Sequence, residues 1–345
     1  MKLVPISFAL YAGTLLLACP LVAQEKTPRL DEKSSSPSAN ASDVAEVKSD
    51  AEPAQTNPPS ERAPKRGIKE LAALAIDARK TERDVIYGKA GDVGLKMDLY
   101  FPKKTDGKLP VTVYVHGGGW QSGDKASGVG VMAIGELVQR GYLVASVNYR
   151  LAPAYKFPAQ IEDVKCAIRF LRAHASDYHL DSQRIGVWGG SAGGHLVALL
   201  GTSDEKASLE GTGGWPNQSS RVQAVVDMFG PSDLTVESGG GHTRISEAVF
   251  GATSSKDEVL KRASPITYVT NDDPPFLILH GDQDRLVPLS QSEKLHQLLK
   301  AAGVSSKLVV VKNAGHSFMP AGGTPQPNRI ELTHIIADFF DEKLK

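Results

Sequence analysis

Ser191 lies between two glycines at a spacing that suits a nucleophile, with Gly189 two residues before it and Gly193 two residues after it. Apolar runs flank this stretch at residues 184–188 and 195–200, which predicts a strand, a tight turn and a helix. Glycines are needed on either side because the strand and helix backbones approach too closely for Cβ atoms. Such a turn strains the serine backbone and exposes its hydroxyl, so Ser191 is the predicted nucleophile. A glycine-rich turn that merely contains a serine has the same local sequence, so a base, an acid and an oxyanion site must lie elsewhere in the chain.

A serine hydroxyl is a weak nucleophile unless a base accepts its proton, and the chain has nine histidines. His316 follows the last predicted strand, where a base can approach Ser191. The acid that orients this base is expected in the turn after the preceding strand, which contains both Asp282 and Asp284. Asp284 is preferred because it is further from the strand and can reach the next loop, while Asp282 stays open as the local alternative. The chain order Ser191, Asp284, His316 is the order expected for this kind of sheet.

Three successive glycines follow His116 directly after the first predicted parallel strand. Such a run allows backbone N–H groups to face a cavity, which suits the stabilisation of a developing oxyanion. The predicted donors are the N–H groups of Gly117, Gly118 and Ala192, the last being the residue after the nucleophile. A flexible glycine turn is the alternative interpretation.

Other histidines are assigned to other roles. His116 belongs to the glycine turn, and His280 lies at a strand end beside the acid loop. His195 begins the helix after the serine turn and is expected to pack beside the site. Residues 239–242, with the sequence GGGH, are assigned to no element, and whether they border the site is left open.

Strand, loop and helix alternate from residue 111 onwards, which is typical of a parallel sheet covered by helices. The predicted strands are residues 83–87, 95–101, 111–115, 142–147, 184–188, 222–229, 276–279 and 307–311. The predicted helices include residues 129–140, 160–174, 290–302 and 329–344. We therefore expect an α/β fold with a mostly parallel central sheet of about eight strands, helices on both faces and an antiparallel N-terminal edge. The candidate catalytic side chains then lie at the carboxyl ends of parallel strands, where ligands bind in open α/β sheets.

The N-terminal residues are typical of an export signal. Lys2 precedes a mostly apolar run, residues 6–22, and Ala23 provides a small residue for cleavage. Residues 1–23 are therefore a predicted signal peptide, and the protein is expected to be periplasmic or secreted, with lipid anchoring through Cys19 as the alternative. Residues 24–66 are rich in Ser, Pro, Ala and Glu and are predicted to be a disordered linker, which leaves residues 67–345 as one domain.

The composition excludes several other functions. Lys and Arg together number 39, as do Asp and Glu, so no net charge favours nucleic acid or an anionic membrane as a partner. The sequence contains no Cys cluster, H-E-x-x-H pattern or phosphate-binding loop, and we expect neither a metal nor another cofactor. Cys166 lies on the apolar side of a predicted helix and is interpreted as a small buried hydrophobe. No sequence feature indicates an obligate protein partner.

From about Thr81 onwards the chain resembles the α/β-hydrolases of the bacterial esterase/lipase group, in particular feruloyl-esterase-like and carboxylesterase-like members related to hormone-sensitive-lipase-type enzymes. The matching motifs are HGGGW (116–120), NYRLAP (148–153), GGSAGG (189–194), HGDQDRLVP (280–288) and AGH (314–316). The resemblance implies the same nucleophile, acid, base and oxyanion donors that the residues themselves predict. One departure is that the nucleophile of this family is often preceded by Asp or Glu, whereas residue 190 is glycine here.

Together these features predict a serine hydrolase that cleaves short-chain or polysaccharide-linked carboxylic esters through an acyl-enzyme. Trp120, Tyr149 and Phe157 are expected to line the substrate pocket. Arg150 is expected to pair with a nearby acid and to hold its loop rather than take part in catalysis. A peptidase of the prolyl-oligopeptidase type is the nearest alternative, and a non-catalytic binding module with this fold is a further one.

Overall fold

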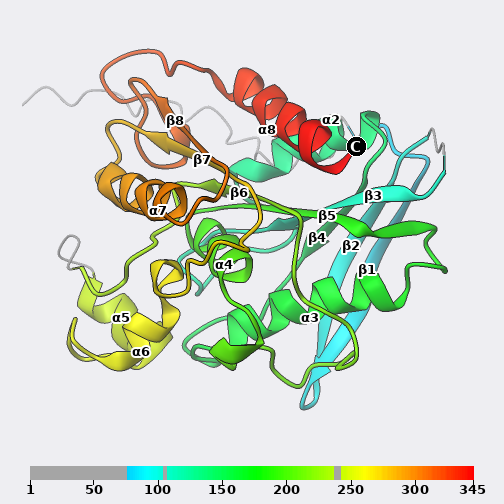
Figure 1. Ribbon diagram of the computed structural model, residues 1–345, viewed down its shortest axis with the longest axis horizontal. Coiled ribbons are helices and arrows are strands. Elements are labelled where there is room, and N and C mark those ends of the chain that lie inside the picture. The colour runs from blue at the N-terminus through cyan, green and yellow to red at the C-terminus, as the bar shows by residue number, and fades with distance from the viewer. Residues whose placement is uncertain (1–75, 104–106, 237–241) are drawn as a thin grey trace, which may run out of the picture. The chain divides into compact units, whose positions relative to one another are not determined.

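A mixed sheet of eight strands forms the centre of the part of the chain that the computed structural model describes, residues 76–103, 107–236 and 242–345 (Figure 1). Its strands are β1 (Lys80–Ala90), β2 (Val93–Phe101), β3 (Leu109–Val115), β4 (Leu143–Val147), β5 (Leu180–Gly190), β6 (Ala224–Met228), β7 (Phe276–Gly281) and β8 (Ser306–Val311). Their spatial order is β1-β2-β4-β3-β5-β6-β7-β8. The β1–β2 and β2–β4 pairs are antiparallel and all the others are parallel, so the predicted fold class and its antiparallel edge are confirmed.

Helices cover both faces of this sheet. On one face lie α2 (Met132–Gln139) and α8 (Arg329–Leu344), and on the other lie α3 (Ala159–Ala173), α4 (Ala192–Thr202) and α7 (Leu289–Ala301) (Figure 1). Two helices that the sequence did not predict, α5 (His242–Phe250) and α6 (Glu258–Ala263), follow β6. Short 3₁₀ turns are present at η1 (Val129–Val131), η2 (Glu205–Ala207), η3 (Pro265–Thr267) and η4 (His316–Phe318). Within the described residues, none of the helices is both long enough and apolar enough to span a bilayer.

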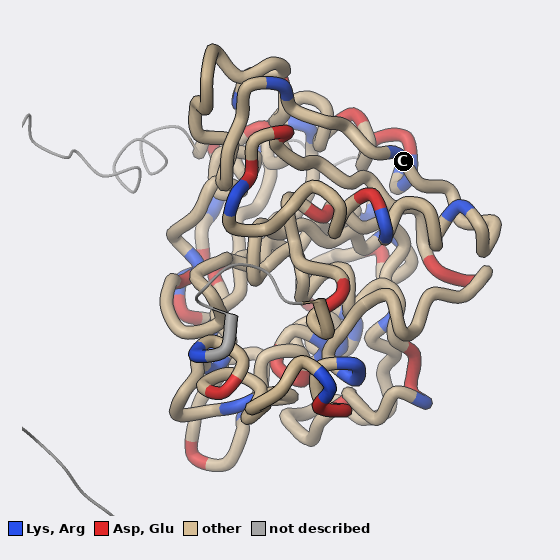
Figure 2. Tube along the Cα trace, turned by 90° about the vertical axis from the view of Figure 1, so that its left-hand side faces the viewer, with Lys and Arg blue, Asp and Glu red and all other residues tan. Residues whose placement is uncertain are grey.

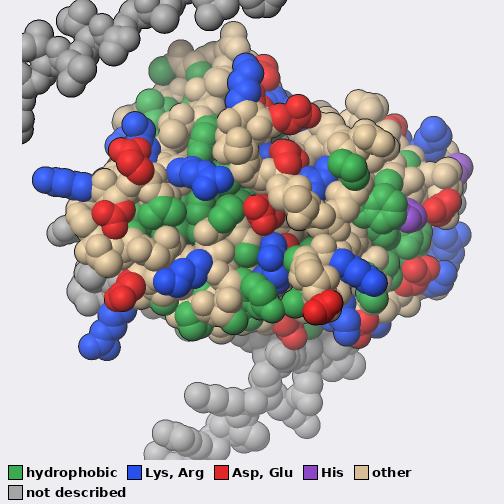
Figure 3. Space-filling model, turned by 90° about the horizontal axis from the view of Figure 1, so that it is seen from below, with side chains coloured by type: hydrophobic (Ala, Val, Ile, Leu, Met, Phe, Trp, Pro, Cys, Tyr) green, Lys and Arg blue, Asp and Glu red, His purple; other side chains and the backbone are tan. Residues whose placement is uncertain are grey.

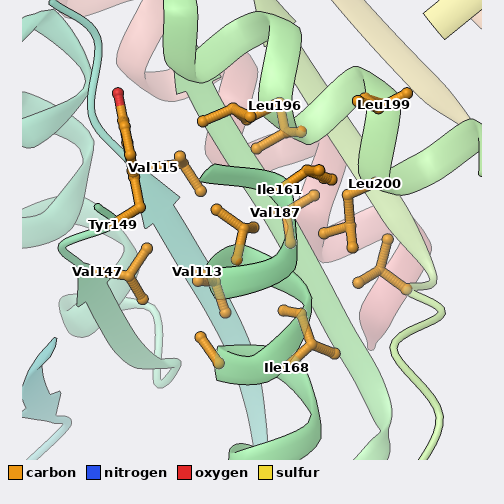
Figure 4. Close-up of a cluster of buried hydrophobic side chains, with 14 of the residues drawn as sticks. Val113, Val115, Val147, Tyr149, Ile161, Ile168, Val187, Leu196, Leu199 and Leu200 are labelled. Carbon is orange, nitrogen blue, oxygen red and sulfur yellow. The ribbon is translucent and has the colours of Figure 1, made fainter. Parts of the chain in front are cut away.

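The central strands are apolar because both of their faces are covered. Every residue of β3, β4, β6 and β7 is buried, as expected for strands between two helical layers. In one cluster, Val113 and Val187 of the sheet pack with Ile161 and Ile168 of α3 and with Leu196 of α4 (Figure 4). This packing fixes the carboxyl ends of the strands, from which the loops of the candidate site leave.

Arg150 holds the loop after β4 through a largely buried ion pair. Its guanidinium donates to both carboxylate oxygens of Asp163, at 2.7 Å from Nη2 to Oδ1 and at 2.9 Å from Nε to Oδ2. Its backbone N–H also donates to Oδ2, at 2.8 Å. Because Asp163 belongs to α3, these bonds tie the loop to the helix, and the predicted pairing of Arg150 with a nearby acid is confirmed.

Cys166 of α3 is a buried hydrophobe, as predicted. Its side chain is fully buried in the same core cluster, and its Sγ lies 3.8 Å from the carbonyl oxygen of Tyr87. Burial raises the pKa of this thiol to about 11, which disfavours the reactive thiolate.

The charged side chains of both signs are interspersed. Short segments of Lys or Arg and of Asp or Glu are scattered over the trace in Figure 2. The face in Figure 3 likewise mixes both signs with hydrophobic side chains. This distribution agrees with the equal numbers of acidic and basic residues in the chain.

Some element boundaries differ from the predictions. The turn predicted over residues 88–94 is reduced to residues 91–92 because β1 and β2 both extend further than their apolar patterns. The helix predicted over residues 129–140 is divided into η1 and α2. The predicted signal peptide and linker, and the glycines at 239–241, lie outside the described residues.

Candidate active site

Ser191 occupies a strained turn between β5 and α4. Its φ of 57° and ψ of −122° lie in a region that non-glycine residues rarely adopt, and α4 begins at the next residue. The backbone N–H of Ser191 donates to the carbonyl oxygen of Met228 at 2.9 Å, which anchors the turn to the end of β6. A Cβ atom at Gly193 would lie only 2.1 Å from the carbonyl oxygen of Val115, so α4 can approach β3 this closely only without a side chain there.

His316 connects Ser191 to Asp284 by two hydrogen bonds. The hydroxyl of Ser191 donates to Nε2 of His316 at 3.0 Å, and Nδ1–H of His316 donates to Oδ2 of Asp284 at 2.7 Å. The carboxylate therefore fixes the tautomer in which Nε2 is free to accept a proton. The three side chains come from loops after β5, β7 and β8, which places them at the carboxyl ends of parallel strands.

Asp284 is held in the ionised form although it is buried. Burial opposes ionisation, but the neighbouring His280 and hydrogen bonds from His316 and the backbone N–H of Val287 hold the pKa of Asp284 well below its usual range. The N–H groups of Leu286 and Val287 both donate to Oδ1, at 2.9 and 3.0 Å.

Asp282, the alternative acid, has a different role. Its Oδ1 accepts a hydrogen bond from the backbone N–H of Ala314 at 3.3 Å, which connects the acid loop to the loop of His316. The imidazole of His316 is hydrogen-bonded to the carboxylate of Asp284 and not to that of Asp282.

His280 lies next to the acid loop, as the sequence predicted. Its imidazole is fully buried, and Nε2 donates to the carbonyl oxygen of Val287 at 2.9 Å while lying 3.5 Å from Oδ2 of Asp284. Nδ1 of His280 accepts from the hydroxyl of Ser292 at 2.7 Å. The ring thus supports the acid loop through the carbonyl oxygen of Val287.

The other two histidines near the site are structural. Nδ1–H of His116 donates to the carbonyl oxygen of Gly117 at 2.7 Å, as expected for a member of the glycine turn. Nε2–H of His195 donates to the carbonyl oxygen of Ala263 at 2.7 Å. Complete burial lowers the pKa of His195 to about 4, so this imidazole stays neutral near pH 7.

A cavity of about 380 Å³ adjoins Ser191, and six of its fourteen lining residues are glycines. Gly117 and Gly118 line it together with Ser191 and His316. Ala192 is the first residue of α4, where the N–H group has no acceptor within the helix and the helix dipole favours negative charge. Gly117 and Gly118 thus border the cavity next to Ser191, and Ala192 directly follows Ser191 at the start of α4.

The three aromatic residues expected in the substrate pocket do not line this cavity. Trp120, Tyr149 and Phe157 are all at most 9% exposed and belong to the hydrophobic core. Trp120 donates from Nε1 to Nδ1 of His195 at 3.2 Å, and the hydroxyl of Tyr149 donates to the carbonyl oxygen of His116 at 3.0 Å. Their proximity in sequence to the functional loops led to the predicted pocket role. Their side chains instead pack in the core, where Trp120 contacts His195 and Tyr149 contacts the backbone of His116.

Other side chains form the apolar wall of the cavity. Val129 of η1, Phe229 after β6 and Leu286 of the acid loop line it. Phe229 follows the carboxyl end of a parallel strand, which is the one sequence signal that could have marked it. Within residues 76–103, 107–236 and 242–345, no group of His, Cys, Asp or Glu side chains is arranged to hold a metal ion.

Comparison with known proteins identifies related chains. Residues 97–299 match the family model BD-FAE. The chain is 33% identical over 243 residues to the esterase LipQ of Mycobacterium tuberculosis, an alignment that covers 68% of this chain but only 56% of LipQ.

Two solved structures are similar over most of their length. A truncated carbohydrate esterase from gut microbiota has a TM-score of 0.67 and 28% identity, covering 78% of this chain and 97% of that one. An esterase of the Planctomycetes species Thermogutta terrifontis, solved with propionate bound, has a TM-score of 0.63 and 28% identity, covering 77% and 94%.

Proposed function

The chain belongs to the BD-FAE family and has an α/β-hydrolase fold, and on this basis we propose that it is a carboxylic ester hydrolase that works through an acyl-enzyme on Ser191. The observation that carries the proposal is the continuous chain of hydrogen bonds from Ser191 through His316 to Asp284. Nucleophile, base and acid within hydrogen-bond reach of one another, beside a cavity, are what nucleophilic acyl transfer requires.

In the proposed reaction, Oγ of Ser191 attacks the ester carbonyl carbon while Nε2 of His316 accepts the hydroxyl proton. The imidazolium then protonates the leaving alcohol, and the acyl group stays on Ser191. Water, deprotonated by His316, then attacks the carbonyl carbon of the acyl-enzyme, and the imidazolium returns the proton to Oγ of Ser191 as the bond from Oγ to the acyl carbon breaks and the carboxylic acid is released. Asp284 stabilises the imidazolium in both halves of the reaction without taking up a proton itself.

The negative charge that develops on the carbonyl oxygen is assigned to backbone donors. The N–H groups of Gly117, Gly118 and Ala192 are the proposed oxyanion hole. Two of these residues line the cavity and the third begins α4, so the assignment is supported by their positions around Ser191.

Esters with short acyl groups or attached to polysaccharides are the proposed substrates. The cavity of about 380 Å³ is near the lower end of the usual range for small-molecule sites and suits a small acyl group. The Thermogutta terrifontis esterase was solved with propionate bound, and the gut-microbiota relative is named a carbohydrate esterase, which supports this choice.

The proposal is tested by comparing kcat/KM across substrate classes. We expect p-nitrophenyl acetate and butyrate to be hydrolysed much faster than p-nitrophenyl octanoate, and acetyl-xylan or methyl ferulate to reveal the natural class of alcohol or acid. Faster cleavage of aminoacyl-p-nitroanilides than of esters would instead favour a peptidase. A folded protein that hydrolyses none of these substrates would favour a non-catalytic binding module.

Export is also part of the proposal and rests on residues 1–23. The full chain expressed in a bacterium is expected in the periplasm or medium, and deletion of these residues should retain it in the cytoplasm. Membrane association that is lost in Cys19→Ser would identify the lipid-anchored alternative.

A further inference from the structure

Phe229 is an unusual residue at the edge of the candidate site. It directly follows β6, its side chain is 1% exposed, and its φ is 45°, a left-handed conformation that is strained for a bulky aromatic residue. Strain of this kind persists only where the surrounding structure imposes it, and it concentrates at functional sites. The conformation of Phe229 therefore calls for a physical reason.

The backbone around Phe229 is held by three hydrogen bonds. Its own N–H donates to the carbonyl oxygen of Leu279 at 2.8 Å, and the carbonyl oxygen of Met228 accepts from the N–H of Ser191 at 2.9 Å. On the other side, Oδ1 of the buried Asp227 accepts from the N–H of Gly230 at 2.9 Å. These bonds fix the turn and connect it directly to the backbone of the candidate nucleophile.

The strained backbone directs the Phe229 ring against His316. The two rings meet edge-to-face, with centroids 4.9 Å apart and planes inclined by 66°. The Phe229 ring also lies edge-to-face to two other rings, with its centroid 4.9 Å from that of Phe318 and 6.5 Å from that of His280. The Phe229 ring thus packs against both His316, the candidate base, and His280, the histidine next to the acid, in the edge-to-face geometry that aromatic pairs prefer.

His316 needs such support because its own loop is strained. Ser317 and Phe318, the two residues that follow it, both have positive φ, at 59° and 54°. Hydrogen bonds to Ser191 and Asp284 restrain the two ring nitrogens, and the contact with Phe229 restrains the ring sideways.

Gly190 is the residue that leaves room for the Phe229 ring. A Cβ atom at position 190 would lie 3.0 Å from Cζ and 3.3 Å from Cε2 of Phe229. The φ of Gly190 is not in the left-handed region, so its backbone accepts a side chain and the obstacle is the neighbouring ring. A methyl group at the position before the nucleophile therefore requires the Phe229 ring, which contacts His316, to shift by a few tenths of an ångström.

We infer that Phe229 is a positioning residue that holds the imidazole of His316 in line with Ser191, and that Gly190 and Phe229 form a matched pair. The inference rests on the proposed function, since it assigns a role within that site. A displacement of a catalytic group by about 1 Å can cost two orders of magnitude in rate, so loss of the contact between the Phe229 ring and His316 has a measurable effect on turnover.

The test is a double-mutant cycle of Phe229→Leu and Gly190→Ala, measured as kcat and KM on p-nitrophenyl acetate and as the rate of phosphonylation by a fluorophosphonate. Phe340→Leu is the matched control, because Phe340 is fully buried in the core against Trp188 and Tyr142 and is not in contact with the site. Circular dichroism establishes folding, and Phe229→Met replaces Phe229→Leu if the latter does not fold.

The inference predicts that Phe229→Leu lowers kcat and the phosphonylation rate about 10- to 100-fold, with KM changed only a few-fold, while the control keeps wild-type values. Gly190→Ala should lose a similar factor, and the double variant should be no slower than Phe229→Leu alone, because the ring with which the added methyl group collides is then absent. An active wild type whose Phe229→Leu variant matches the control would overturn the inference, as would losses that multiply in the double variant. A wild type that neither hydrolyses the ester nor reacts with the probe would refute the proposed function, and this inference with it.

Discussion

Replacement of Asp227 by asparagine should change how the stability of the protein depends on pH. Asp227 lies in β6 with its side chain fully buried. Oδ1 accepts the hydrogen bond from Gly230, whereas Oδ2 has no hydrogen-bond partner among the described residues. Burial raises the pKa of this carboxyl from the ordinary value of 3.8 to about 7, although the Gly230 hydrogen bond and His280 oppose the shift.

The sign of the effect follows from proton binding. Between pH 4 and pH 7 the unfolded chain loses the proton of Asp227 while the folded protein keeps it, so the free energy of unfolding falls as the pH rises. Each pKa unit corresponds to about 1.4 kcal/mol, so a shift of about three units amounts to at most about 4 kcal/mol. Asparagine keeps the acceptor for Gly230 and cannot ionise.

Urea unfolding of wild type and Asp227→Asn at pH 4.5, 6 and 8 measures the pH-dependent contribution of Asp227 to the free energy of unfolding. The asparagine variant should gain stability relative to wild type as the pH rises, by a few kcal/mol between pH 4.5 and pH 8. Asp233→Asn is the matched control. Burial raises the pKa of Asp233, but hydrogen bonds from Lys294 and Thr235 outweigh burial and hold this pKa below its ordinary value of 3.8, so the difference in stability between wild type and Asp233→Asn should stay nearly constant from pH 4.5 to pH 8. A stability difference between wild type and Asp227→Asn that is the same at every pH would refute the reasoning.

Three further predictions concern the acid, the loop after β4 and the cysteine. Asp284→Asn should lower kcat/KM for p-nitrophenyl acetate about 10⁴-fold, whereas Asp282→Asn should stay within a few-fold of wild type; equal losses would contradict the assignment of the acid. Arg150→Ala should lower the free energy of unfolding by about 3 kcal/mol in urea titrations, because it leaves the carboxylate of Asp163 buried without its partner, and should keep kcat; unchanged stability would contradict the structural role. Cys166 should react with a thiol reagent at neutral pH only after unfolding, since it is buried with a pKa of about 11; fast labelling of the native protein would argue against this packing.

The fold was predictable where the sequence expresses burial as a pattern. Continuous apolar runs marked the parallel strands because such strands are covered on both faces. The observed sheet contains all eight predicted strands, the two at its antiparallel edge included. Helices α5 and α6 were missed for different reasons. The nine residues of α5 contain the β-branched residues Thr243, Ile245 and Val249, and the six residues of α6 are too few to show a helical period.

The candidate site was predictable in its chemistry but not in its walls. Residue type and chain order were enough to select Ser191, Asp284 and His316, because each lies after a strand of a parallel sheet. Which aromatic side chains reach the cavity depends on how the loops assemble: Phe229 lines the cavity, whereas Trp120 packs against His195, and neither placement is a property of the neighbours in sequence. The contact of Phe229 with His316 arises from the neighbouring positions of β6, β7 and β8 in the sheet, which no local pattern encodes.

The most direct test of the central claim is the intact mass of the protein after treatment with a fluorophosphonate, measured for wild type and Ser191→Ala in parallel with hydrolysis of p-nitrophenyl acetate. The account predicts that wild type gains one adduct, located on Ser191 by peptide mapping, and loses its activity in step with labelling. Ser191→Ala should gain no adduct and should hydrolyse the ester at least about 10³-fold more slowly. Hydrolysis by Ser191→Ala at the wild-type rate, or an inactivating adduct on a different residue, would contradict it.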